Sequence, residues 1–159
     1  MAPGGRGVVW SAMADRIGAL RIVEERVTAY LGAMGLAPDK TEEGLYLLKA
    51  GSSVVMISLF EEGGDSYVRF ASIMLKGFDP SLELLQRILR LNTEVLFGSF
   101  LMFEDSTLSF SATLLGDHLD YEEFEKTLTY VARVSDEYDD ELQTLGGGQR
   151  AEDVLREVE

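Results

Sequence analysis

Side chains able to do acid–base or nucleophilic chemistry are few in this sequence, and their spacing matches no catalytic arrangement. The one histidine, His118, lies between Asp117 and Leu119, just before a helix that we expect to begin at Asp120. No serine stands in a nucleophile-elbow pattern, and there is no cysteine for a histidine to activate. We therefore interpret His118 as a surface or capping residue, and we predict no catalytic residue and no enzymatic activity.

Patterns that bind cofactors or metals are also missing from the sequence. Neither G-x-x-x-x-G-K nor G-x-G-x-x-G occurs between an expected strand and an expected helix. The run Gly146-Gly147-Gly148 follows a helix instead of opening one, so it offers a phosphate no helix N-terminus. Zinc–thiolate sites and disulfides require cysteine and are excluded. We predict no cofactor and no metal site.

An acidic cluster near the end of the last expected helix is a candidate binding surface. It consists of Asp136, Glu137, Asp139, Asp140 and Glu141. Carboxylates in the last turns of a helix oppose its dipole, at a cost of roughly a few tenths of a kcal/mol each, so their presence points mildly to a function. One helical face cannot supply the roughly 6–8 oxygen ligands of Ca²⁺. Two interpretations stay open, namely a surface for a basic partner segment and a solvated face without a partner.

The net charge of -14 restricts the classes of partner. Residues 1–103 are nearly balanced, whereas residues 104–159 carry almost all of the negative excess. Because nucleic acids and anionic membranes attract Lys and Arg, we predict no nucleic-acid and no membrane partner. Basic or amphipathic proteins are favoured, although the acidity could also serve solubility alone.

The composition predicts one globular domain with a short segment at either end. We expect a flexible leader over residues 1–10, a single domain over residues 11–145, and a Gly hinge with an acidic tail over residues 146–159. No segment approaches the roughly 20 apolar residues of a membrane span. The apolar run Val8-Val9-Trp10 is too short for a signal peptide. We predict a cytoplasmic protein, which the lack of cysteine fits.

Hydrophobic periodicity predicts the order helix, three strands, helix, two strands, helix. The helices are expected over residues 11–34, from an Asp79 cap to about residues 92–95, and from an Asp120 cap to Leu145. The strands are expected over residues 44–50, 52–60, 67–75, 98–103 and 107–115. Together they predict an α+β fold with a five-stranded antiparallel sheet. Residues 52–60 are apolar on both faces, which indicates a strand covered on both sides or covered by a partner subunit.

The stretch from Leu91 to Leu142 resembles the YbjN family, whose domain is similar to the class I type III secretion chaperones. The matching residues are Leu91-Asn92, Phe97-Gly98-Ser99-Phe100, the run Ala112 to Asp117 and the acidic run Ser135 to Glu141. The resemblance implies a twisted antiparallel sheet with helices packed on it. It also implies a homodimer that binds a segment of another protein, or a regulatory role, without catalysis.

A dimer interface is expected around the second helix. Leu85, Ile88, Leu89 and Val95 form one apolar stripe there, and Leu84 and Leu91 lie off it. We therefore assign the interface to Leu84, Leu91, Gly98 and Phe100. Asn92 and Gly98 are interpreted as structural residues where the second helix connects to the next strand. The side chain of Asn92 can satisfy backbone groups near a helix end.

Three hypotheses of function remain open. The leading one is a non-enzymatic, chaperone-like or regulatory module that acts as a cytoplasmic homodimer and binds a partner segment. The alternative is a small-molecule-binding regulatory domain with a pocket between sheet and helix. The third is an interaction domain whose only function is to dimerise.

Overall fold

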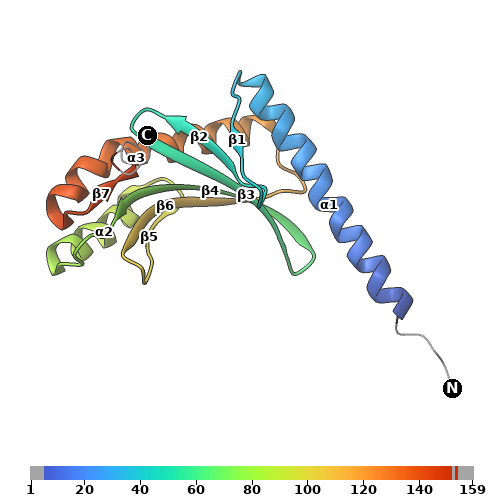
Figure 1. The fold of residues 1–159 in the computed structure, drawn as a ribbon, viewed down its shortest axis with the longest axis horizontal. Coiled ribbons are helices and arrows are strands. Elements are labelled where there is room, and N and C mark those ends of the chain that lie inside the picture. Colours follow the sequence, from blue (N-terminus) through green and yellow to red (C-terminus); the bar gives the residue numbers. More distant parts are fainter. Residues whose placement is uncertain (1–5, 152, 154–159) are drawn as a thin grey trace.

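The computed structural model describes residues 6–151 and 153, with side chains described from residue 18 onward. Over this part of the chain, three helices accompany one sheet (Figure 1). The elements are α1 (Arg6–Ala33), β1 (Asp39–Lys40), β2 (Tyr46–Ala50), β3 (Ser53–Glu62), β4 (Asp65–Lys76), α2 (Leu82–Glu94), β5 (Ser99–Met102), β6 (Thr107–Leu115), α3 (Tyr121–Gly146) and β7 (Gln149–Arg150).

The sheet has the strand order β1-β2-β3-β4-β6-β5, and β7 pairs with the end of β4. All of these pairs are antiparallel. The predicted α+β fold, with its antiparallel sheet, three helices and order of main elements, is confirmed. The predicted number of strands is wrong, because the sheet has seven. The added strands, β1 and β7, have two residues each, which is too short for an alternating pattern to show in a sequence.

Glycines and caps at the ends of elements explain where the chain turns. Gly63 and Gly64, at φ 66° and 97°, connect β3 to β4 in a tight hairpin, because glycine adopts positive φ without steric cost. Asp120 caps α3 as predicted, accepting a hydrogen bond from the backbone N–H of Glu123 at 2.8 Å. The cap of α2 is Ser81 and not the predicted Asp79; its side chain accepts from the backbone N–H of Leu84.

The core lies between α3 and one face of the sheet. Its fully buried side chains include Val55 and Ile57 of β3, Phe70 of β4 and Phe124 of α3. The rings of Phe70 and Phe124 meet at 5.2 Å between centroids. Val54, Met56 and Phe60, which alternate with the buried residues of β3, are only half-buried. Helices therefore cover β3 on one side only. The expectation that this strand would be covered on both sides within its own chain is wrong.

The helix α2 lies beside β5 and against α3 (Figure 1). Its buried residues are Leu84, Ile88 and Leu91, spaced four and three apart, as one helical face requires. Leu89 is 68% exposed. The predicted stripe is therefore only partly correct: Ile88 is buried and Val95 packs against the core, but Leu89 is exposed. Leu84 and Leu91, expected to lie off the stripe, belong to the face turned to the core.

The two ends of the domain differ from the sequence-based expectation. The first helix begins at Arg6, so residues 6–10 are helical, and the rest of the expected leader lies outside the described residues. The backbone carbonyl of Gly146 accepts a hydrogen bond from the N–H of Asp79 at 2.9 Å. A Cβ on Gly148 would lie 2.6 Å from the carbonyl oxygen of Lys76. The glycine run, expected as a hinge, is therefore packed against residues 76–79. It leads into β7, and the tail from residue 154 lies outside the described residues.

None of the described helices combines the length and apolar character needed to cross a bilayer.

Candidate functional site

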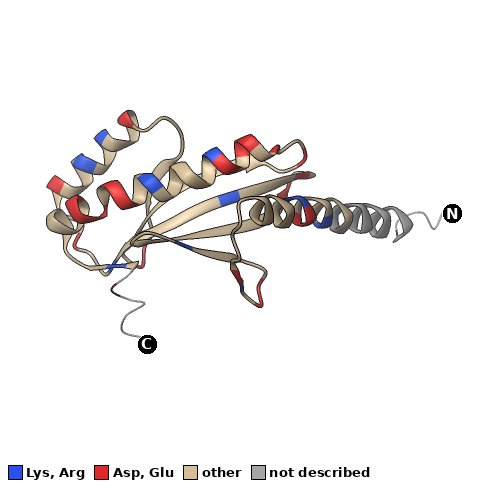
Figure 2. Ribbon diagram, turned by 90° about the horizontal axis from the view of Figure 1, so that it is seen from above, with Lys and Arg blue, Asp and Glu red and all other residues tan. Residues whose placement is uncertain are grey.

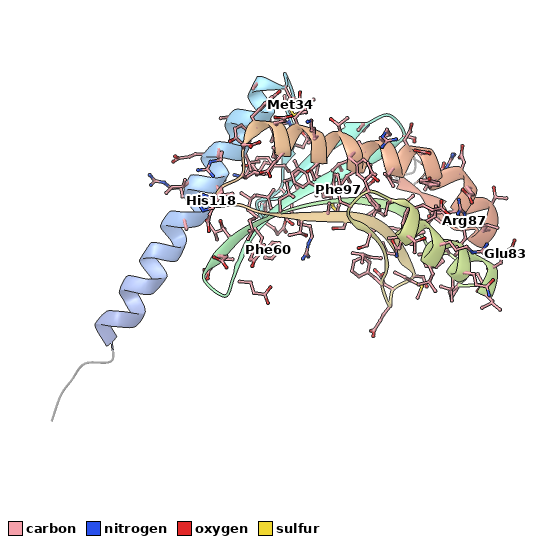
Figure 3. The ribbon with its side chains drawn as sticks, turned by 180° about the vertical axis from the view of Figure 1, so that it is seen from behind. Met34, Phe60, Glu83, Arg87, Phe97 and His118 are labelled. Carbon is pink, nitrogen blue, oxygen red and sulfur yellow. The ribbon has the colours of Figure 1, made fainter. Side chains whose placement is uncertain are left out.

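His118 lies on an exposed loop that joins β6 to α3 (Figure 3). The loop is held by structural contacts. The guanidinium of Arg26 donates to the carbonyls of Gly116 and Asp117, at 3.0 and 2.8 Å, and the hydroxyl of Ser66 donates to the carboxylate of Asp117. In the part of the chain that the structure describes, no three His, Asp or Glu side chains gather as a metal site would require. These contacts fix the loop that carries His118 and have a structural role.

The five residues of the acidic cluster lie in the C-terminal half of α3, beyond the two basic residues of that helix, Lys126 and Arg133 (Figure 2). Each has a partner within its own chain. Ser52 contacts Asp136 and Asp139, Arg133 lies 3.6 Å from Glu137, Arg150 pairs with Asp140, and Arg87 of α2 donates to Glu141. Arg87, labelled in Figure 3, also pairs with Glu94 of its own helix, and its pair with Glu141 joins α2 to α3. Much of the cluster therefore fastens α3 to neighbouring segments, which the sequence could not show.

Asp139 is the buried member of the cluster, at 5% exposure. The Oγ atom of Ser52 lies 2.6 Å from Asp136 Oδ1 and 3.1 Å from Asp139 Oδ2. A hydroxyl has one hydrogen, so it can donate to only one of the two carboxylates. Burial raises the pKa of Asp139, while the hydrogen bonds from Ser52 and the Asp140 N–H lower it less strongly.

We expect Asp139→Asn to be more stable than the native chain at neutral pH. A pKa raised on folding means that ionised Asp139 destabilises the folded state. The native stability is therefore fully present below the ordinary carboxyl pKa of about 4 and is lost as pH rises through the raised folded pKa. The advantage of Asn should vanish as pH falls toward about 4, which urea unfolding at several pH values would measure. Asp39→Asn, at an exposed position of β1, is the control. Destabilisation by Asp139→Asn at neutral pH would contradict this account.

An apolar groove of about 220 Å³ lies between the end of α1, the strand β2 and α3. Its apolar walls are formed by Met34, Leu36, Leu48, Ala50, Leu128 and Ala132. Met34 stands at the end of α1 in Figure 3. Leu128 and Ala132 are four residues apart on α3, so they lie on one helical face, one turn apart. Hydrophobic periodicity did not mark these residues as a binding site, because it does not reveal which strand lies nearest the edge of the sheet.

The groove is bordered by an open strand edge. β1 pairs only with Tyr46 and Leu47 of β2. Within the described residues, no strand pairs with Leu48, Lys49 or Ala50 on the side away from β3. Unpaired backbone groups on such an edge can accept a further strand. An extended segment added there would place alternate side chains toward the groove.

Of the four residues assigned to a dimer interface, three lie in the core of the chain and one lies at its surface. Leu84 and Leu91 are fully buried and Phe100 is 4% exposed, all within a single chain. They are core residues, so the assignment of these three to direct contact with another subunit is wrong. Gly98 is at the surface, with φ 78°. The exposed large apolar side chains of α2, β5 and the residues flanking β5 are Leu82, Leu89, Leu96, Phe97, Leu101, Met102 and Phe103.

Asn92 connects α2 to β5. Its side-chain oxygen accepts from the backbone N–H of Phe100 at 2.7 Å, and its amide nitrogen lies 3.4 Å from the carbonyl oxygen of Phe100. Asn92 therefore satisfies backbone groups of a strand and not those of its own helix. Phe100 pairs with Phe110 of β6 on the other side.

The hypothesis of a small-molecule pocket between sheet and helix has no support. The layer between α3 and the sheet is filled by buried side chains, among them Phe70, Phe110, Phe124 and Val131.

A protein-family model described as "T3SS (YopN, CesT) and YbjN peptide-binding chaperone 1" matches residues 19–154. This match confirms the resemblance read from the sequence. No curated protein matches the chain in sequence.

Solved structures share the fold at low sequence identity. The ExsC–ExsE complex has a TM-score of 0.60 at 18% identity, over 77% of this chain and 95% of that chain. The Yersinia pestis type III secretion chaperone SycH, in complex with a stable fragment of YscM2, has a TM-score of 0.55 at 13% identity, over 72% and 98%. YbjN from E. coli has a TM-score of 0.57 at 15% identity, over 74% and 92%.

Proposed function

The chain belongs to the family of T3SS (YopN, CesT) and YbjN peptide-binding chaperones, and we propose that it binds an extended apolar segment of a partner protein beside β2, without catalysing a reaction. The observation that carries this proposal is the open edge of Leu48 to Ala50 bordering the apolar groove. Backbone hydrogen bonds to β2 would hold the segment whatever its sequence, and the groove would select segments that carry apolar side chains.

The size of the groove supports a segment and not a cofactor. At about 220 Å³ it is smaller than the roughly 300–1,000 Å³ of small-molecule pockets. Each backbone hydrogen bond contributes about 1 kcal/mol net, and each buried large apolar side chain about 1.5–3 kcal/mol. Two or three such bonds with one or two anchored side chains give roughly 4–9 kcal/mol before the cost of association, so the open edge and this groove alone would bind a segment weakly.

The partner segment is proposed to carry basic residues beside its apolar ones. Glu42 and Glu43 are exposed in the turn that joins β1 to the start of β2. The acidic cluster on α3 is part of the same proposal, with a smaller role because its members already pair within the chain. The expected cytoplasmic location belongs to this proposal as well.

A homodimer is also part of the proposal. Leu82 and Leu89 are seven residues apart on α2, so they lie on one helical face, and they are 72% and 68% exposed. Leu101 and Phe103, at and just beyond β5, are 38% and 52% exposed. Apolar side chains gathered on a surface favour an interface with another chain.

We expect Ala132→Arg to weaken peptide binding at least about tenfold, because a long cation would enter the apolar groove. The probe is a set of fluorescent peptides selected from a random display library on the native chain, with affinity measured by anisotropy. Ala29→Arg makes the same change at an exposed position of α1 outside the groove and should bind normally. Failure to select any peptide, or equal binding by the two variants, would refute the proposed site.

A further inference from the structure

A second apolar groove, of about 550 Å³, lies on α3 beside the loop that joins α2 to β5. Leu96 and Phe97 of that loop and Tyr130 of α3 form its apolar part. Leu96 is 81% exposed and Phe97 40%. A single exposed leucine needs no explanation, but two adjacent large apolar side chains beside a groove do.

The loop is held in place with these side chains outward. The backbone N–H of Leu96 donates to the hydroxyl of Tyr130 at 2.7 Å, and the N–H of Val95 donates to the carbonyl of Leu91 at 3.0 Å. The rings of Phe97 and Tyr130 lie 4.4 Å apart between centroids, and Phe97 stands beside α3 in Figure 3. The loop therefore holds Leu96 in a conformation that leaves its side chain exposed. This indicates a surface that contacts another molecule.

Thr129 lines both this groove and the groove beside β2. The two are therefore neighbours on opposite sides of the exposed crest of α3. A helix with its side chains is about 10–12 Å wide, and an extended chain advances about 3.3 Å per residue. About four residues of an extended segment would connect one groove to the other.

The rim of the second groove carries two basic side chains. Lys126 and Arg133 line it, with Glu125 as the one acid. The guanidinium of Arg133 lies over the ring of Tyr130, at 5.1 Å from its centroid. Both cations form exposed ion pairs one helical turn away, Lys126 with Glu122 and Arg133 with Glu137. Such pairs are weak and can be exchanged for a new partner.

We propose that the groove of Leu96, Phe97 and Tyr130 is a second anchor for the same partner segment, taking a leucine or aromatic side chain next to an acidic residue. This inference rests on the proposed function, since the segment is the one that pairs with β2. The anchor residue lies about four residues from the added strand. Lys126 and Arg133 receive the neighbouring carboxylate, which gives the segment its direction across α3.

The test uses the fluorescent peptides selected on the native chain, each in full length and shortened by the residues beyond the β2-pairing part. Leu96→Ser removes an exposed side chain and should leave the fold intact, as circular dichroism would show. It should weaken the full-length peptides about tenfold, to the affinity of the shortened ones, and leave the shortened ones unchanged. Leu115→Ser, at a 56% exposed position of β6, is the matched control and should bind like the native chain.

The outcomes separate this inference from the proposed function. If Ala132→Arg weakens binding and Leu96→Ser does not, the second anchor is wrong and the peptide site beside β2 stands. If neither variant weakens binding, both are wrong. If Leu96→Ser instead lowers the molar mass in light scattering, the loop is an interface between copies, and the anchor is wrong. A selected set without a leucine or aromatic residue beside an acid also overturns it.

Discussion

A Leu91→Asp chain is expected to be unfolded at neutral pH, whereas a Leu89→Asp chain is expected to fold. The two positions lie two residues apart on α2, and their side chains are 0% and 68% exposed. Removing a buried leucine side chain alone costs about 2–5 kcal/mol. An unpaired carboxylate in the same place adds a desolvation cost that can exceed the roughly 5–15 kcal/mol stability of a domain.

The pair also tests the proposed dimer. If the exposed face of α2 joins two copies, Leu89→Asp should halve the molar mass in light scattering while circular dichroism stays native. A folded, monomeric Leu91→Asp chain would contradict the burial of that residue and restore the interface first assigned from the sequence. A Leu89→Asp chain with unchanged mass would exclude this face of α2 from the interface.

Gly98→Ala is expected to destabilise the chain by about 3–5 kcal/mol, and Gly63→Ala by about 1 kcal/mol. Both glycines have positive φ, 78° and 66°, so both substitutions strain the backbone. They differ in their surroundings. A Cβ on Gly98 would lie 2.8 Å from the carbonyl oxygen of Ser111 and 2.9 Å from the ring of Phe110, whereas a Cβ on Gly63 has no neighbour within 4 Å.

Urea unfolding of the two variants would measure this difference, since the excess loss in Gly98→Ala reports the overlap with β6 alone. Equal losses would mean that β5 can shift away from β6 at little cost. A larger loss of unfolding free energy in Gly98→Ala would explain why the chain has a glycine before β5. The close approach of the two strands requires the absence of a side chain there, independently of any contact with another subunit.

The local features of the fold could be predicted because they depend on neighbours in the chain. Leu108, Phe110 and Ala112 alternate along the strand expected over residues 107–115, and all three side chains are buried in the core. Ser109 and Ser111 between them are buried as well, which alternation does not predict. The Asp120 cap and the Gly63-Gly64 turn are likewise short-range patterns. The residues that carried the family resemblance also lie at such joints, where Asn92 holds Phe100 and Gly98 approaches Ser111.

The candidate site depends on contacts between distant parts of the chain, which only the tertiary structure decided. Glu141 is paired by Arg87 across 54 residues of sequence, and Asp139 by Ser52 across 87, so the acidic cluster could not be recognised as a fastening of α3. The apolar residues of α2 fit more than one stripe, and packing against β5 and α3 selected the face with Leu84 and Leu91.

The sequence predicted the order of the main elements and the fold class, because caps, turns and alternation act over a few residues, and its motifs indicated the family. The tertiary structure decided which strand edge stays open, which acids are already paired and which leucines are left at the surface. Those features depend on which segment covers a residue. Hydrophobic periodicity shows which residues share a face, but it does not show what that face packs against.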